Sequence, residues 1–324
     1  METQTPLPAA NNGDSTNAVA ERPRKRFPVL TWLTCVACGI VYAGLSLEAN
    51  HESWDVLSKW GYYPVDEIRE GAYWALLTSV FVHLELWHVI FNVYWLYLLG
   101  TRLERAIGSW RWLAFVLGAA LISSGAELAV SDDTGIGASG VAYGLFGFMW
   151  ICRDRFPGFR DVLDRRTVAL FIVWLGGCIF LTLTKVWEVG NAAHLAGMAF
   201  GAGTGAALLF ERKRALILCA LVFLFVASLV PLFWAPWSFD WTSQRAVRAY
   251  EKSDYDAAIK WYQRSLQLGQ DKIWCWTNLA LAYHAKGDPQ LYAEALKTLR
   301  KLDQKAAEEL EKEIMSEKTS EGSK

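Results

Sequence analysis

Long apolar stretches alternate with short polar loops over the first two thirds of the chain. The first runs from Phe27 to Leu47, and at roughly 20 residues it is long enough to cross about 30 Å of hydrocarbon as a helix. Six more apolar segments follow, at residues 86–100, 111–130, 139–152, 167–184, 192–210 and 215–234. The pattern predicts seven helices within a membrane, and the helix at 139–152 is short for one that faces lipid.

The last third of the chain is polar and carries a helical pattern with a weak internal repeat of about 34 residues. One segment follows the spacing W-x-x-L-[GA]-x-x-Y of a tetratricopeptide repeat, through Trp276, Leu279, Ala280 and Tyr283. At most two such units fit between residues 239 and 316. The segment therefore resembles a short tetratricopeptide array, and a generic helical hairpin is the alternative.

Polar segments without hydrophobic periodicity are expected at both ends of the chain. Residues 1–26 are predicted to be a disordered tail that ends in the basic cluster Arg22, Arg24, Lys25 and Arg26, and residues 317–324 a second tail. Between the two tails, the predicted parts are a helical core at 27–210, a basic loop with the seventh helix at 211–238, and a helical domain at 239–316.

Basic residues mark every second loop. They follow the second, fourth and sixth apolar segments, as Arg102, Arg105 and Arg111, then Arg153, Arg155, Arg160, Arg165 and Arg166, then Arg212, Lys213 and Arg214. Positive loops stay on the cytoplasmic side, so the N-terminus is predicted to be cytoplasmic. Seven crossings then place the C-terminal helical domain outside. The compact loops favour a bacterial plasma membrane.

Composition supports a membrane protein and narrows the chemistry. The 324 residues are 53% hydrophobic, with 17 Trp. A net charge of -1 gives no basic field, so no nucleic-acid partner is expected. Cys35 and Cys38 form a C-x-x-C pair inside an apolar helix and are interpreted as buried small residues. We expect no metal site and no cofactor.

Four polar side chains stand out within the apolar segments, where burial costs a few kcal/mol and needs a reason. They are His88, Asn92, Ser139 and His194. His88 and Asn92 are four residues apart and therefore share one face of their helix. Both side chains are expected to direct hydrogen-bond donors at one point.

Ser139 lies in the glycine-rich sequence G-I-G-A-S-G-V-A-Y-G at the start of the fourth apolar segment. Taken alone, a serine at a helix start is more often an N-cap. The pair Gly140 and Gly144, however, forms a G-x-x-x-G pattern that lets another helix approach closely. Tyr143 lies one turn along on the same face as Ser139.

The sixth apolar segment carries one stripe of small residues that includes a histidine: Gly190, His194, Gly197 and Gly201. A lone membrane histidine is more often a structural hydrogen-bonding group or part of a proton relay. The glycines change this interpretation because they let the helix approach Ser139 within hydrogen-bond range of His194. The pattern predicts a Ser-His dyad, with His88, Asn92 and the backbone N–H of Ser139 stabilising an oxyanion.

These residues resemble those of the rhomboid family of intramembrane serine proteases over residues 28–210. The resemblance rests on H-x-x-x-N at His88 and Asn92, G-x-S-G at 137–140 followed by Tyr143, and A-H-x-x-G-x-x-x-G at 193–201. It implies a six-helix bundle around a water-filled cavity, with Ser139 as nucleophile and His194 as general base. His88 and Asn92 would form the oxyanion hole, and Tyr143 would stack on the histidine.

The same resemblance implies supporting roles for further residues. Glu104, within Gly100–Gly108, would help to hold the first external loop, and His83 would brace that loop. The glycines of the two motifs would support the site, and they are Gly137, Gly140, Gly197 and Gly201. One departure is Trp74-Ala75, where the family commonly has Trp-Arg.

The expected fold is an all-α membrane protein: a rhomboid-like six-helix bundle, a seventh transmembrane helix and a small repeat-like helical domain. The expected function is cleavage of single-pass transmembrane proteins within the lipid bilayer. The alternative is a catalytically silent rhomboid-like protein that binds transmembrane clients, and a proton-conducting transporter is a third reading. A protein or peptide partner at the C-terminal helical domain is also expected.

Overall fold

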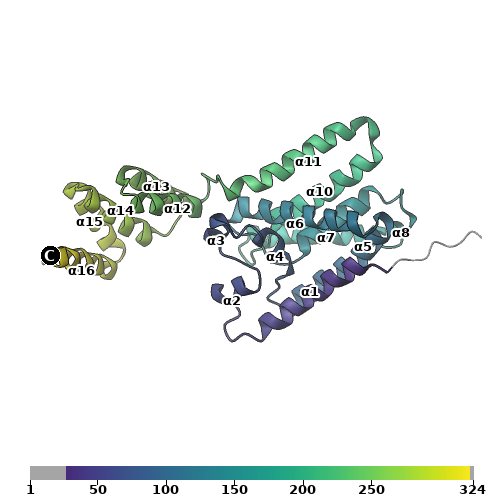
Figure 1. Ribbon diagram of the computed structural model, residues 1–324, viewed down its shortest axis with the longest axis horizontal. Helices are drawn as coiled ribbons and strands as arrows, with labels where there is room; N and C mark the ends of the chain where they lie inside the picture. Colours follow the sequence, from purple (N-terminus) through teal and green to yellow (C-terminus); the bar gives the residue numbers. More distant parts are fainter. Residues whose placement is uncertain (1–26, 322–324) are drawn as a thin grey trace, which may run out of the picture.

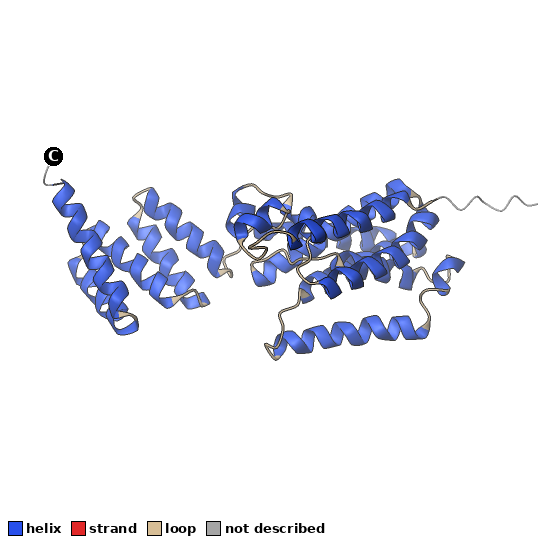
Figure 2. Cartoon of the chain, turned by 90° about the horizontal axis from the view of Figure 1, so that it is seen from below, coloured by secondary structure: helices blue, strands red, loops and turns tan. Residues whose placement is uncertain are grey.

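The computed structural model describes residues 27–321, and this part of the chain contains helices and no strand (Figure 2). The predicted tail at 1–26 lies outside the described residues. Seven long helices match the seven apolar segments: α1 (Val29–Ser46), α5 (Leu86–Ile107), α6 (Ser109–Ser131), α7 (Ser139–Ile151), α9 (Arg165–Leu183), α10 (Asn191–Leu209) and α11 (Arg214–Leu229). The all-helical fold predicted from the sequence is confirmed.

Five of the described helical segments have the length and composition needed to cross a membrane. They are α1, α6, α9, α10 and the segment Glu211–Leu232, which includes α11. α5 meets the same test only together with the short helices before it, Ala75–Phe81, from which it is bent by 103°. α7 has 13 residues, of which Gly140 to Met149 are all buried. It is short because other helices, rather than lipid, surround it.

Short helices fill the connection between α1 and α5. They are α2 (Trp54–Lys59), α3 (Val65–Glu70), α4 (Ala75–Thr78) and the 3-10 turn η1 (Ser79–Phe81). In Figure 1, α3 lies at the end of the bundle next to the C-terminal helices, whereas α8 (Pro157–Arg160) lies at the opposite end. The basic loops after α5, α7 and α10 therefore lie away from the connection that holds α3.

The centre of the bundle is a close contact between α7 and α10. A Cβ atom on Gly197 would collide with the carbonyl oxygen of Gly140, and one on Gly201 would collide with that of Gly144. Only glycine lets the two backbones approach this closely. The contact fixes the relative position of the first turns of both helices.

Glu104 lies in the last turns of α5, and its expected role in holding the first external loop is wrong. Its carboxylate accepts hydrogen bonds from the Leu30 and Thr31 N–H groups, at 3.1 and 2.8 Å, and from the Thr31 and Ser109 hydroxyls, both at 2.7 Å. It therefore holds the first turn of α1 at the opposite end of the bundle. Glu104 lies about 27 Å along α5 from Leu86, the first residue of the helix, so its side chain cannot reach the loop that precedes α5.

The C-terminal region forms two helical hairpins and a last helix. They are α12 (Phe239–Glu251), α13 (Tyr255–Leu268), α14 (Lys272–Lys286), α15 (Pro289–Leu302) and α16 (Gln304–Glu321). Ala246, Ala258 and Ala280 are fully buried in one apolar cluster with Tyr262 and Tyr283. Small residues at these positions allow the close helix packing that a repeat needs.

The tail predicted at 317–324 starts too early. α16 continues to Glu321, and residues 322–324 lie outside the described residues. Ala307, Leu310 and Ile314 bury one face of this helix against the hairpin before it. Their spacing of three and four residues is the helical pattern, and the Glu- and Lys-rich continuation has good helix propensity.

Arg69 of α3 joins the membrane helices to the C-terminal helices. Its side chain is 3% exposed, and Nη2 donates to the Asp132 carboxylate at 2.7 Å and to the Ser238 hydroxyl at 3.4 Å. Ser238 is the N-cap of α12. An ion pair between Arg248 and Glu70 spans the same junction at 3.2 Å. The helical domain is therefore fastened to the bundle by buried and exposed polar contacts.

Because α7 and α10 are in close contact, adding a single methyl group at their interface should strongly lower the stability of the fold. Gly201→Ala should destabilise the fold by roughly 1–3 kcal/mol or more, because the two backbones must separate. Gly177→Ala in α9 is the matched control, since a Cβ there meets nothing within 4 Å. Thermal unfolding in detergent measures both, and equal midpoints for the two variants would contradict the packing argument.

The junction also predicts a pH dependence. Burial, reinforced by the Asp132 and Asp66 carboxylates, raises the pKa of Asp240 from its ordinary value of 3.8 to about 6. The folded state then binds this proton more tightly than the unfolded state, so stability falls as the pH rises from about 4 to 6.

Asp240→Asn should flatten this fall and stabilise the full chain at pH 7 by about 1 kcal/mol, after allowance for solvent screening. Unfolding midpoints between pH 4.5 and 7.5, compared with the exposed Glu294→Gln, check the prediction. An unchanged pH slope in the Asp240 variant would show that another group causes it.

Candidate active site

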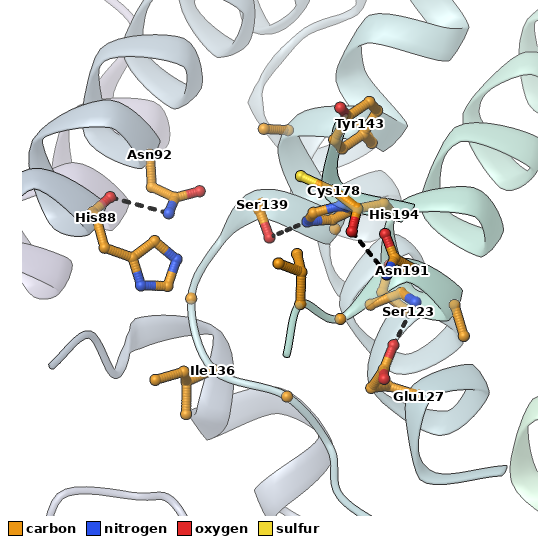
Figure 3. A pocket seen from close by; sticks show the side chains of 18 of the residues that line it. His88, Asn92, Ser123, Glu127, Ile136, Ser139, Tyr143, Cys178, Asn191 and His194 are labelled. Carbon is orange, nitrogen blue, oxygen red and sulfur yellow. Dashed lines mark hydrogen bonds between the residues drawn. The ribbon is translucent and has the colours of Figure 1, made fainter. Parts of the chain in front are cut away.

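A cavity of about 820 Å³ opens among the helices at the end of the bundle that carries the loop at 132–138. Its lining comes from α5, α6, α7, α9 and α10, together with that loop and residues 185–190. Figure 3 shows that the side chains of His88 and Asn92 lie on one side and those of Ser139 and His194 on the other. Polar groups from separate helices therefore face one enclosed space.

Ser139 and His194 are in direct contact. The Oγ atom of Ser139 lies 2.7 Å from Nε2 of His194, as the dashed line in Figure 3 marks. His194 is 4% exposed, and Ser139 is half-buried at the edge of the cavity. A neutral imidazole at this distance can accept the hydroxyl proton and so make the oxygen nucleophilic.

The loop before Ser139 depends on Gly137. This residue has a φ of +92°, and a Cβ on it would lie 2.7 Å from Nε2 of His88 and 3.3 Å from Nε2 of His83. The backbone therefore passes between two histidine rings with no room for a side chain. Ser139 is the first residue of α7, so its N–H has no partner within the helix.

Tyr143 packs on the imidazole of His194. The ring centroids are 4.7 Å apart with an interplanar angle of 34°. The tyrosine hydroxyl donates to the Phe171 carbonyl oxygen at 3.1 Å, which ties the ring to α9. The imidazole orientation is thus held by packing on one face and by the hydrogen-bonded serine at Nε2.

His88 and Asn92 line the cavity opposite Ser139. Asn92 is 3% exposed, and its Nδ2 donates to the His88 carbonyl oxygen at 3.0 Å. The second hydrogen of the same amide nitrogen is left for another acceptor. The Asn92 amide therefore keeps one N–H for the cavity, and the His88 side chain lines the same space in front of the serine.

His83 is completely buried and connects the first loop with the loop before Ser139. Its Nδ1 lies 3.1 Å from the Phe81 carbonyl oxygen, and its Nε2 accepts from the Ala138 N–H at 3.4 Å. Ala75, at the departure from the family pattern, is fully buried in an apolar cluster with Leu128 and Leu232. The alanine thus contributes to the packing beneath the loop.

Glu127 is a cavity residue that is not among the site residues predicted from the sequence. This residue lies in α6, is 6% exposed and lines the cavity. Its Oε2 accepts from the Ala193 N–H at 2.9 Å, next to His194 (Figure 3). Its position in the sequence indicates a special role, because Glu127 is the one carboxylate inside the apolar segment 111–130. A carboxylate is among the costliest side chains to bury in a membrane.

Aromatic side chains close the cavity between α5 and the chain around α9. Phe91 lies 5.6 Å from Trp174, and Trp87 lies 4.9 Å from Trp187, measured between ring centroids. Side chains rather than closely packed backbones bridge this gap. Among residues 27–321, no group of three or more His, Cys, Asp or Glu side chains is placed to hold a metal ion.

Comparison with known proteins assigns two regions of the chain. Residues 70–211 match the family model described as Rhomboid domain, and residues 248–287 match the one described as TPR repeat. The rhomboid protease GlpG of Salmonella choleraesuis (strain SC-B67) is 29% identical over 178 residues, which cover 55% of this chain and 62% of the relative. The protein of the same name from Salmonella paratyphi A (strain ATCC 9150 / SARB42) matches with the same identity and coverage.

The chain spans less than two thirds of the length of these relatives. The two matches confirm both resemblances drawn from the sequence. Together with the five apolar helical segments, they identify a multi-pass integral membrane protein with a C-terminal helical repeat region.

Proposed function

Because residues 70–211 match the family model described as Rhomboid domain, we propose that this protein is an intramembrane serine endopeptidase that cleaves transmembrane segments of other membrane proteins. The observation that carries the proposal is the 2.7 Å contact between Ser139 Oγ and His194 Nε2. A nucleophile and its base that are buried together among membrane helices can act on a peptide bond that lies within the bilayer.

The proposed reaction has two steps. His194 takes the hydroxyl proton of Ser139 while the serine oxygen bonds to the substrate carbonyl carbon. The tetrahedral intermediate collapses as His194 returns the proton to the leaving amine. Water then attacks the acyl-enzyme, with the same histidine as its base, and Ser139 is released with its proton. Tyr143 keeps the imidazole in place through both steps.

The negative charge that forms on the carbonyl oxygen needs donors already aimed at it. The Nδ2 of Asn92, the ring of His88 and the backbone N–H of Ser139 are proposed to supply them. Fixed donors in an enclosed site are effective because they need no reorganisation as the charge develops. Asn92 is held by its bond to the His88 carbonyl, so its amide is oriented before substrate binds.

A transmembrane substrate must reach the cavity sideways from the lipid. The gap between α5 and α9 is the proposed route, because the Phe91–Trp174 and Trp87–Trp187 pairs close it with side chains alone. Side-chain rotation is fast and leaves the helix backbones in place. The substrate segment must unwind near the cavity to expose its peptide bond, so helix-weakening residues are expected there.

The proposed orientation follows from the two ends of the molecule. The basic loops lie at the end opposite the cavity and the C-terminal helices, so that end is proposed to face the cytoplasm. The N-terminus would then be cytoplasmic and the repeat region extracytoplasmic, in a bacterial plasma membrane. In this position the repeat region is proposed to bind a protein or peptide partner outside the membrane.

Loss of the nucleophile or its base should abolish cleavage. A purified single-pass transmembrane reporter in detergent should give a discrete fragment with the wild-type protein and none with Ser139→Ala or His194→Ala. Ser46→Ala, which removes an exposed hydroxyl bonded only to the Tyr42 carbonyl, should cut normally. If no form cuts and all bind the reporter, the protein is the silent client-binding alternative, and if Ser139→Ala still cuts, the nucleophile is another group.

Loss of an oxyanion donor should lower the rate constant more than the affinity. Asn92→Ala should reduce kcat by roughly 10²–10³-fold with KM little changed. Asn191 also lines the cavity, but its amide bonds the Thr182 hydroxyl at 2.7 Å, so Asn191→Ala serves as a control for loss of a cavity amide. Steady-state cleavage of the reporter separates kcat from KM, and equal kcat values for the two variants would contradict the donor role.

A further inference from the structure

A carboxylate lies between the two segments that carry Ser139 and His194. Glu127 is 6% exposed within α6, a helix long and apolar enough to cross the membrane. Burying this group is costly, so its contacts must offset the cost. The proposed reaction gives Glu127 no part in proton transfer or in stabilising the oxyanion.

The first contact of Glu127 is with the start of α10. The N-cap of this helix is Gly190, which has no side chain to satisfy the first N–H groups. Oε2 of Glu127 accepts from the Ala193 N–H at 2.9 Å, the third residue of the helix. A Cβ on Gly190 would lie 3.4 Å from the same oxygen, so the carboxylate lies directly beside the N-cap residue.

The second contact is with the loop before Ser139. A Cβ on Gly135 would lie 3.5 Å from Cγ of Glu127, so the loop backbone passes directly over this side chain. Asp133 holds the loop in this path, since its Oδ1 accepts from the Gly135 N–H at 2.8 Å. Its other carboxylate oxygen is bonded to the Tyr62 hydroxyl. The Glu127 side chain therefore lies against the loop and is bonded to the first turn of α10.

We propose that Glu127 is a positioning residue that caps α10 from outside the helix and keeps the His194 imidazole within hydrogen-bond distance of Ser139. His194 follows Ala193 directly, so movement of the capped N–H moves the histidine backbone. The consequence for catalysis rests on the proposed protease function, whereas the capping contact itself does not. A shift of about 1 Å at such a site can cost about 100-fold in rate.

The chain contains a matched control for this proposal. Glu104 is also a buried carboxylate that caps a neighbouring helix, because α1 begins after Pro28 and its third residue, Thr31, donates its N–H to Glu104 Oε2 at 2.8 Å. The two glutamates are 3% and 6% exposed. Glu104, however, lies at the opposite end of the bundle from Ser139.

Two readouts on the full chain in detergent test the proposal. Hydrogen exchange measured by mass spectrometry reports the cap, and the rate of Ser139 labelling by a fluorophosphonate reports the reactivity of the serine. Glu127→Ala should speed exchange at residues 190–195 and slow labelling by about 10–100-fold per folded molecule. Glu104→Ala should speed exchange at residues 28–33 and leave labelling unchanged.

Glu127→Gln keeps an oxygen that can accept from the Ala193 N–H, so its Ser139 should be labelled at a rate within a few-fold of the wild-type rate. This variant also tests the proposal if Glu127→Ala does not fold. Unchanged exchange at 190–195 in a folded Glu127→Ala, or equal loss of labelling in Glu104→Ala, would overturn the proposal. If the wild-type protein is not labelled at Ser139, the protease function fails, and hydrogen exchange still decides the cap.

Discussion

The site depends on the close approach of the α7 and α10 backbones. Gly197 packs on the Gly140 carbonyl and Gly201 on the Gly144 carbonyl, and no side chain fits between them. Ser139 and His194 lie on the first turns of these two helices. Since each helix is a rigid rod over one or two turns, the glycine contact also sets the distance between the two side chains. The 2.7 Å contact at the cavity is a consequence of packing deeper in the membrane.

Those parts of the fold that depend on local sequence patterns could be predicted from the sequence. Apolar stretches of sufficient length predicted the seven helices, and glycines three or four residues apart predicted which helices meet closely. The short segment 139–152 signalled a helix enclosed by others, as α7 is. The placement of Ser139, His194 and Tyr143 on one side of the cavity also follows from helical spacing, because each residue lies on the face that its motif indicates.

Contacts between residues far apart in the chain could not be predicted this way. The contact of Glu104 with the first turn of α1 could not be predicted because its partner Thr31 is 73 residues away and no periodicity links them. Glu127 and Arg69 were missed for the same reason, since Ala193 and Ser238 are distant in sequence. A charged residue in an apolar segment indicates that its side chain has a partner. The sequence pattern alone does not identify the helix or the backbone group that serves as this partner.

The two buried glutamates show how this membrane protein satisfies its helix ends. Neither Pro28 nor Gly190 can cap the helix that follows it, and within the bilayer there is little water to replace a cap. In each case a carboxylate from a neighbouring helix accepts the N–H of the third residue, at 2.8 and 2.9 Å, where the helix dipole favours negative charge. The hydrogen bond thus lowers both the cost of burying the carboxylate and the cost of leaving the helix end uncapped. The same kind of cap, a buried carboxylate from another helix, therefore serves the scaffold at α1 and the candidate site at α10. The two capped turns differ in function, because only the one in α10 carries the histidine that contacts Ser139.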